Sequence, residues 1–213
     1  MSVEAEACEA ASRGRRAQAA GALAWGLGLG LAGPATADDL GSTMITLFDG
    51  VGVLEDITEY ALDRDGLTET EDRILGLAIG QAIGWLGDGL SLDVETQAVY
   101  HHGRGSFIEL GAALVARWQG LSLPEWLGGV RLIDGFSIGT GPTVTTAIPP
   151  LEADRGRISH VLNQVVVEFL GGEPADGPLR PIGRVHHRSG IFGLIEGIVG
   201  GSDYIGEGLQ LRF

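Results

Sequence analysis

The chain lacks lysine altogether and has one cysteine among its 213 residues. Its 14 basic side chains are therefore all arginine, they are outnumbered by 28 acidic side chains, and the formal net charge is −14. A chain with this balance is a poor partner for nucleic acid, whose phosphates attract positive surfaces. The acidic segment 63–72 could bind cations, but we interpret it as a solvated run of charges.

The single cysteine, Cys8, precedes the apolar run 17–33, so it cannot be a lipid-modified residue at a cleavage point. Export without disulfides favours a bacterial envelope protein over a small disulfide-stabilised domain. Residues 1–37 have the pattern of a cleaved signal peptide. The acidic stretch at 1–10 is unusual for a signal peptide and suggests that translation starts further along the chain. The alternative for 1–37 is an amino-terminal anchor helix. The positive region, apolar run and cleavage site are Arg13-Gly14-Arg15-Arg16, residues 17–33 and Ala35-Thr36-Ala37.

Beyond residue 37 the sequence lacks an apolar run long enough to cross a membrane as a helix. A membrane location would therefore require a closed β-barrel, since only closure pairs every backbone group within lipid. Residues 38–213 form one expected domain, in which alternating apolar and polar positions are separated by turn-rich breaks. This pattern predicts eight strands, at 42–49, 72–84, 89–101, 105–118, 129–141, 158–170, 179–190 and 202–213.

The strand predicted at 89–101 alternates without interruption. A soluble β-sandwich would alternate in the same way, so the pattern alone does not separate lipid contact from a protein core. Segment 51–66 differs, because its apolar residues recur at helical spacing. The sequence is compatible there with a short amphipathic helix or with an irregular loop. In 89–101 the apolar positions are Leu90, Leu92, Val94, Thr96 and Ala98, and the polar ones are Ser91, Asp93, Glu95 and Gln97.

Strand length and aromatic positions favour the membrane barrel. The predicted strands have about ten residues or more, which suits a tilted bilayer crossing, whereas soluble strands average about half of that. Tight links at 86–89 and 102–105 are expected to alternate with longer loops, and the many glycines suit a crowded barrel interior. Aromatic residues near strand ends fit an interfacial girdle. They are Trp85, Tyr100, Phe107, Trp118, Trp126, Phe136 and Phe169.

The last predicted strand alternates up to an aromatic carboxy-terminus, Phe213. Its odd positions are mostly apolar, as in lipid-facing strands of outer-membrane barrels. His187 and Ser189 share this parity in the preceding strand, and Asp203 would stand beside them across the hairpin. A base, a nucleophile and an acid would thus lie on the lipid side of the wall, at the extracellular end if both termini are periplasmic.

These three residue types can form a nucleophilic triad. A serine hydroxyl needs an adjacent base to attack an ester, and the histidine needs an acid to fix its tautomer. Glu207 has the right parity but lies about 13 Å further along the strand, and Glu196 in the connecting loop is a weaker alternative. The competing interpretation is that small polar residues at strand ends only mark the membrane interface.

Adjacent histidines point to opposite faces of a strand. His186 is expected to point into the barrel and to bond with Arg184 or Arg188. His101 and His102 are divided in the same way, so neither pair can bind one metal through both imidazoles. We therefore expect no metal site.

The carboxy-terminal third resembles the outer-membrane lipid A 3-O-deacylases, whose chains close a strand in His-x-Ser, continue in a Gly-rich loop and present an acid near the terminus. Here these features are His187-Arg188-Ser189, residues 190–202 and Asp203. The resemblance implies that His187 is the base, that Ser189 is the nucleophile, and that Asp203 replaces the family's Glu. The sequence HHRSGIFGL also resembles a broader group of proteobacterial envelope proteins.

The family usually has Asn after its serine, where this chain has Gly190. Backbone amides between Gly190 and Gly193 could stabilise the oxyanion instead, which makes these two glycines the oxyanion candidates. The resemblance implies a substrate, lipid A or lipopolysaccharide, and no cofactor. It also implies a dependence on the barrel-assembly machinery of the outer membrane.

We therefore expect an all-β protein, an eight-stranded antiparallel up-and-down transmembrane barrel of a Gram-negative outer membrane. Its expected activity is that of a serine esterase on an acyl chain of lipid A or a related outer-leaflet lipid. The alternatives are a non-enzymatic barrel with a structural or adhesion role and a vestigial His-x-Ser motif, and a soluble periplasmic β-sandwich. The acyl position and the oligomeric state stay open.

Overall fold

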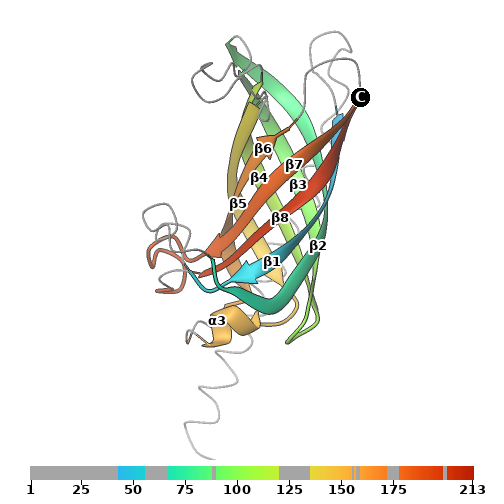
Figure 1. The fold of residues 1–213 in the computed structure, drawn as a ribbon. Helices are drawn as coiled ribbons and strands as arrows, with labels where there is room; N and C mark the ends of the chain where they lie inside the picture. Colours follow the sequence, from blue (N-terminus) through green and yellow to red (C-terminus); the bar gives the residue numbers. More distant parts are fainter. Residues whose placement is uncertain are drawn as a thin grey trace, which may run out of the picture.

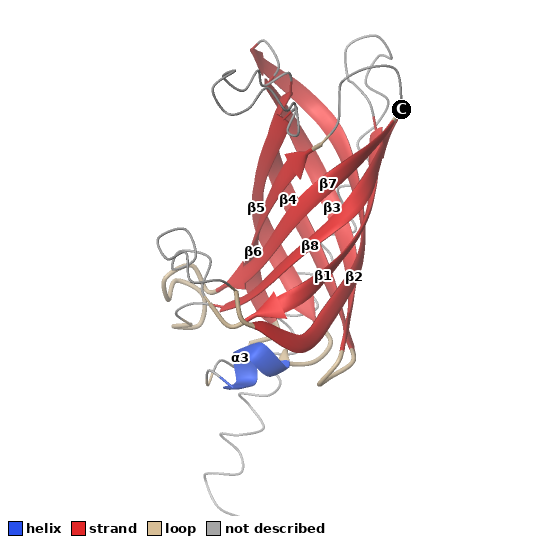
Figure 2. Cartoon of the chain, in the orientation of Figure 1, coloured by secondary structure: helices blue, strands red, loops and turns tan. Residues whose placement is uncertain are grey.

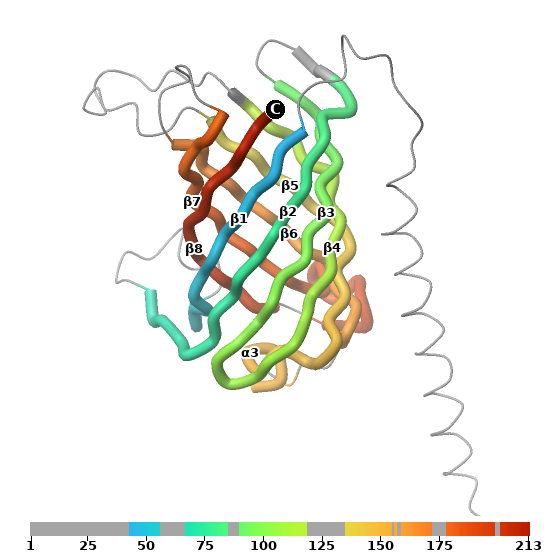
Figure 3. Tube along the Cα trace, turned by 90° about the vertical axis from the view of Figure 1, so that its right-hand side faces the viewer, coloured from blue at the N-terminus to red at the C-terminus, as the bar shows by residue number. Residues whose placement is uncertain are grey.

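The chain forms a closed barrel of eight antiparallel strands in which each strand pairs with its sequence neighbours (Figure 1). Pairing of β1 with β8 closes the sheet, so the expected all-β up-and-down architecture is confirmed (Figure 3). The strands are β1 (Thr43–Val53), β2 (Glu69–Gly87), β3 (Leu90–His102), β4 (Phe107–Gln119), β5 (Gly135–Thr145), β6 (Val161–Leu170), β7 (Leu179–Ser189) and β8 (Gly201–Arg212).

This computed structural model describes a defined part of the chain. The expected signal peptide at 1–37 and residues 56–66 lie outside the described residues, as does Trp126. The described residues are 43–55, 67–87, 90–119, 135–154, 156, 159–171, 178–198 and 201–213.

Segment 51–66 begins differently from either expectation. Its first residues, 51–53, continue β1, and Val53 pairs with Glu69 of β2 and with Asp203 of β8. The helical spacing therefore misled at these positions, because cross-strand pairing determines their backbone conformation. Asp72, placed by the sequence in a solvated charge run, is a buried residue of β2 that binds Arg104 through Oδ2 at 2.5 Å.

The prediction that tight and long links alternate is also wrong. The tight link 88–89 joins β2 to β3 and the next one, 103–106, joins β3 to β4, so the two lie at opposite ends of the barrel. The connection 146–160 between β5 and β6 is long and shares its end with 103–106. It contains α3 (Pro150–Asp154), the one helix in the described residues, which lies at the end away from the carboxy-terminus (Figure 2). Among the described residues, no helix has the length and apolarity to span a bilayer.

The barrel has polar side chains inside and apolar side chains outside. On β3 the polar positions Asp93, Glu95 and Gln97 are 0–5% exposed and point into the lumen. On the outer face Leu77 and Leu114 are 45% and 50% exposed. A soluble sandwich would bury the apolar face instead, so this distribution excludes it and gives the architecture of an outer-membrane barrel.

Paired charges fill the middle of the lumen. Arg117 Nε lies 2.9 Å from Asp93 and its Nη1 lies 3.1 Å from Glu168. Arg184 binds Glu168 at 2.5 Å and Glu95 at 2.9 Å. All five side chains are at most 4% exposed, so each buried charge has an opposite charge within contact distance.

A second lumen cluster corrects two sequence predictions. His186 Nε2 lies 3.1 Å from Glu109 and its Nδ1 lies 3.4 Å from Gln97, so its expected bond with Arg184 or Arg188 is not formed. Phe107 was expected in the aromatic girdle, but it is buried and stacks on His101 with the ring centroids 4.2 Å apart. His186 reaches across the lumen, which pairing between neighbouring strands does not reveal.

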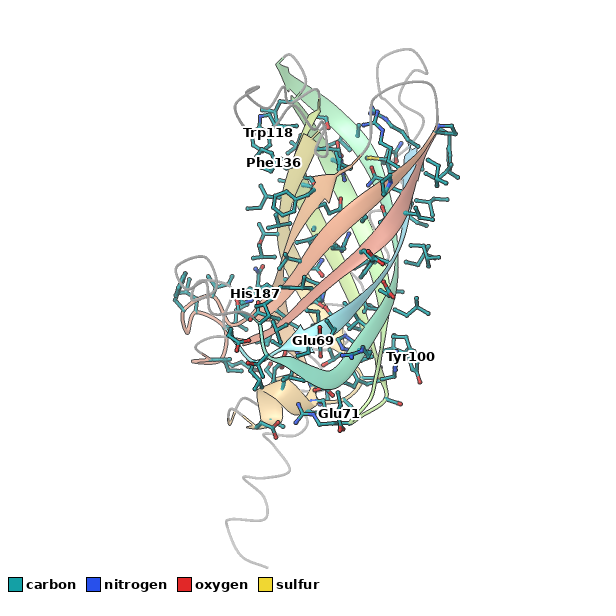
Figure 4. All side chains as sticks on the ribbon, viewed as in Figure 1. Glu69, Glu71, Tyr100, Trp118, Phe136 and His187 are labelled. Carbon is teal, nitrogen blue, oxygen red and sulfur yellow. The ribbon has the colours of Figure 1, made fainter. Side chains whose placement is uncertain are left out.

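Aromatic side chains nevertheless mark both ends of the outer wall. Trp118 and Phe136 stack with centroids 4.6 Å apart near one end, and Tyr100 lies near the other (Figure 4). Tyr100 and Phe169 are each 43% exposed. These four residues fit the expected girdle of rings at the membrane interfaces, while the side chain of Trp85 lies outside the described part of the structure.

Candidate functional site

The last hairpin brings together the residues that the sequence singled out. His187 pairs with Asp203 across β7 and β8, and Ser189 pairs with Gly201. The side chains alternate, with His186 and Arg188 pointing into the lumen, so His187 and Ser189 point outward. They lie at the end of the barrel opposite the carboxy-terminus, as His187 shows (Figure 4).

His187 and Asp203 make direct contact. The distance from His187 Nδ1 to Asp203 Oδ1 is 2.7 Å, and the two side chains are 13% and 1% exposed. A proton on Nδ1 donated to the carboxylate leaves the lone pair on Nε2. This is the tautomer that a histidine needs in order to accept a proton from a neighbouring hydroxyl.

The other oxygen of this carboxylate is unsatisfied. Asp203 Oδ2 is buried and has no hydrogen-bond partner within the described residues. A buried acceptor left unpaired costs about 1–3 kcal/mol, so native proteins rarely keep one without compensation. Polar groups held at such a cost are characteristic of functional sites.

Ser189 is 8% exposed, and the hydrogen bonds of the described residues include none between it and His187. Its other neighbour is Asn163, which pairs with it across β6 and β7. Asn163 Nδ2 donates to Thr140 Oγ1 at 2.9 Å and to the Gln164 carbonyl at 3.0 Å. Asn163 is the only asparagine of the chain and falls within the strand predicted at 158–170, but the sequence pattern did not single it out.

One of the two oxyanion candidates is already engaged. The Gly193 amide donates to the Ile198 carbonyl at 3.0 Å, so it is not available in this conformation. In the described part of the chain the amides of Ile191 and Phe192 donate no hydrogen bond, so they join the candidates for an oxyanion donor. The signal for this was absent from the sequence, because it depends on the conformation of the loop.

Gly190 is required by its surroundings. A Cβ at this position would lie 2.1 Å from the Ile198 carbonyl oxygen, which is far inside contact distance. An asparagine, as in the lipid A deacylases, would therefore displace the loop that follows.

Three side chains support the site from inside the barrel. Arg188, between His187 and Ser189, binds both carboxylate oxygens of Glu152 on α3 at 2.5 and 2.6 Å. Ser202, next to Asp203, donates to the same carboxylate at 3.0 Å. Burial raises the pKa of Glu152, and the Arg188 guanidinium opposes that rise.

The alternative acids do not contact His187, and the histidine pairs divide between the two faces of their strands. Glu207 pairs with Gly183, four positions along the strand from Asp203, and in the described structure neither Glu207 nor Glu196 accepts a hydrogen bond from His187. The histidine pairs point to opposite faces as expected, since His101 and His186 are buried and His102 is exposed. No group of three or more His, Cys, Asp or Glu side chains in the described residues is arranged to hold a metal ion.

No protein-family model and no curated protein matches the sequence. Among solved structures, the chain is similar to the outer membrane enzyme PagL, with a TM-score of 0.52, 11% identity and coverage of 80% of this chain and 99% of that chain. Neisserial surface protein A (NspA) gives a TM-score of 0.44 at 9% identity, covering 81% and 97%. The outer membrane protein AlkL in lipid bilayers gives 0.31 at 11% identity, covering 85% and 94%. The likeness to PagL is one of fold.

Proposed function

We propose that this barrel is a serine esterase that removes an ester-linked acyl chain from lipid A or a related lipid of the outer leaflet. The observation that carries the proposal is the 2.7 Å contact between His187 and Asp203 on the outward face, two positions from Ser189. The fold supports it in a general way, because PagL is an outer membrane enzyme with a similar barrel. The resemblance of the last hairpin to lipid A 3-O-deacylases supports the substrate class.

In the proposed reaction Ser189 Oγ attacks the ester carbonyl while its proton passes to His187 Nε2. Asp203 holds the imidazole and stabilises its positive charge. The amides of Ile191 and Phe192 donate to the oxyanion of the tetrahedral intermediate. Its collapse breaks the bond to the sugar oxygen, which leaves with the proton from His187. Water, deprotonated by His187, then attacks the acyl-enzyme and releases a fatty acid and free Ser189.

The outward location of the site agrees with this substrate. A soluble ester would reach a lumen or a cleft facing water, whereas His187 and Ser189 face the lipid side of the wall. An outer-leaflet lipid can present its ester there without leaving the membrane. Charge pairs occupy the middle of the lumen, so the proposal places no substrate there.

The proposal is tested by expressing the barrel in a lipopolysaccharide-producing host and weighing its lipid A by mass spectrometry. We expect the loss of one hydroxyacyl mass with the parent protein and with Ser106→Ala, which changes an exposed serine in a tight link at the same end of the barrel. Ser189→Ala should leave lipid A unchanged. Unmodified lipid A from cells that carry the folded parent in the outer membrane would contradict the proposal and favour the non-enzymatic barrel.

A further inference from the structure

The loop between β7 and β8 has a strained backbone. Ile191, Phe192 and Gly193 have φ values of 50°, 53° and 91°, which is one turn of left-handed conformation. A β-branched and an aromatic side chain rarely adopt it, at a cost of about 1–3 kcal/mol each. Two backbone hydrogen bonds hold the turn, from Leu194 to Ile191 at 3.0 Å and from Ile195 to Gly190 at 2.9 Å.

The strained turn exposes two large apolar side chains. Phe192 is 90% exposed and Leu194 is 82% exposed, more than any other large hydrophobic side chain in the described residues. Ile198, at the end of the same loop, is 8% exposed. The loop leaves the barrel wall sideways rather than continuing along the barrel axis (Figure 2).

In water this arrangement is unfavourable, because burying a Phe or Leu side chain is worth about 1.5–3 kcal/mol. In a membrane it is favourable. The outward residues of β7 and β8, the two strands that the loop connects, belong to the apolar exterior that contacts lipid. Val185 and Leu209 are among them. Phe192 and Leu194 therefore extend that exterior outward at the level of Ser189.

We propose that residues 190–198 insert Phe192 and Leu194 into the outer leaflet and bind an acyl chain there, next to Ser189. The occupant is a lipid acyl chain, because the loop is continuous with the lipid-facing wall and carries apolar side chains at its most exposed positions. Presentation of that chain's ester to Ser189 rests on the proposed esterase function. Insertion of the loop does not, so the two can be tested separately.

Insertion is measured with a single cysteine that carries an environment-sensitive fluorophore, in a Cys8→Ser background and in phosphatidylcholine vesicles with brominated acyl chains. We expect strong quenching at Phe192→Cys and at Leu194→Cys, and weak quenching at Ser106→Cys, an exposed position at the same end of the barrel. Equal quenching at all three positions would overturn the insertion. A fluorophore signal at Phe192→Cys or Leu194→Cys that changes with the protein-to-lipid ratio would also overturn the insertion. It would show that a second copy of the protein, and not lipid, covers these side chains.

Acyl-chain binding is measured with ester substrates of two chain lengths. The variant Leu194→Ser, which leaves the proposed oxyanion amides of Ile191 and Phe192 in place, should raise KM for a long-chain ester by about tenfold, with KM for a short-chain ester unchanged. Equal changes for both esters would overturn acyl-chain binding. If no ester is hydrolysed by any variant, the esterase proposal fails, while quenching still decides whether the loop inserts into the leaflet.

Discussion

Replacement of Asp203 by Asn should separate the activity of this protein from its stability. The substitution keeps the size of the side chain and removes its charge. In the folded barrel Asp203 Oδ1 lies 2.7 Å from His187 Nδ1, and the carboxylate is 1% exposed. The variant therefore changes one charge-assisted hydrogen bond and leaves the packing in place.

The magnitude follows from that contact. A hydrogen bond to a charged group contributes about 1.5–3 kcal/mol, and each 1.36 kcal/mol corresponds to a factor of ten in rate. Loss of the charge should thus lower kcat by about 10- to 150-fold. If the Asn amide also reverses the imidazole tautomer, the loss should reach about 10⁴-fold, as for such a change in serine protease triads.

Stability should change less than activity. The variant loses the charge-assisted hydrogen bond to His187, but a neutral amide also removes the cost of a buried carboxylate whose Oδ2 has no hydrogen-bond partner among the described residues. We expect the free energy of unfolding of Asp203→Asn, measured in urea from lipid vesicles, to stay within about 1–2 kcal/mol of the parent. Activity and stability would then be separated at one residue.

The assay is hydrolysis of a long-chain ester by the reconstituted barrel, with unfolding measured on the same preparation. Asp203→Glu is the control, because it retains the carboxylate charge and lengthens the side chain by one methylene. It should keep most of the activity. A kcat for Asp203→Asn within threefold of the parent would refute the role of the acid, whatever the stability.

Three further changes test the barrel and the loop. Arg184→Ala removes two buried ion pairs in the lumen, with Glu95 and with Glu168, although Glu168 keeps its contact with Arg117; it should lower the free energy of unfolding by about 3–5 kcal/mol in urea titrations. Leu77→Arg, on the outer face of β2, should cost about 2–4 kcal/mol in vesicles if it lies at mid-membrane, and no loss would contradict lipid contact there. Gly190→Ala places a Cβ 2.1 Å from the Ile198 carbonyl oxygen; it should abolish esterase activity while the barrel still folds, as judged by heat-dependent gel mobility.

The local contacts of the fold could be predicted from the sequence. Alternation along β3 identified its two faces, and the short span between His187 and Asp203 allowed their pairing to be predicted from parity alone. Which face is buried could not be predicted from that strand, because period two is the same in a sandwich and in a barrel. The exposed Leu77 and Leu114 decide it.

Contacts that cross the lumen were not predictable in the same way. His186 meets Glu109 of β4, and this depends on the stagger of strands around the whole barrel. Asn163 lies opposite Ser189 because of the register in which β6 and β7 pair. The sequence does not fix that register, because it does not show where β6 ends and β7 begins. The left-handed conformation of Ile191 and Phe192 had no sequence signal, since neither residue favours it.

The central claim is that Ser189 is a nucleophile activated by His187. The most direct test is the intact mass of the reconstituted barrel after exposure to a long-chain fluorophosphonate, followed by peptide mapping. The account predicts one covalent adduct, on Ser189, in the parent and in His102→Ala, and its loss in His187→Ala. An unmodified Ser189 in the folded parent, or an adduct that forms equally well without His187, would contradict it.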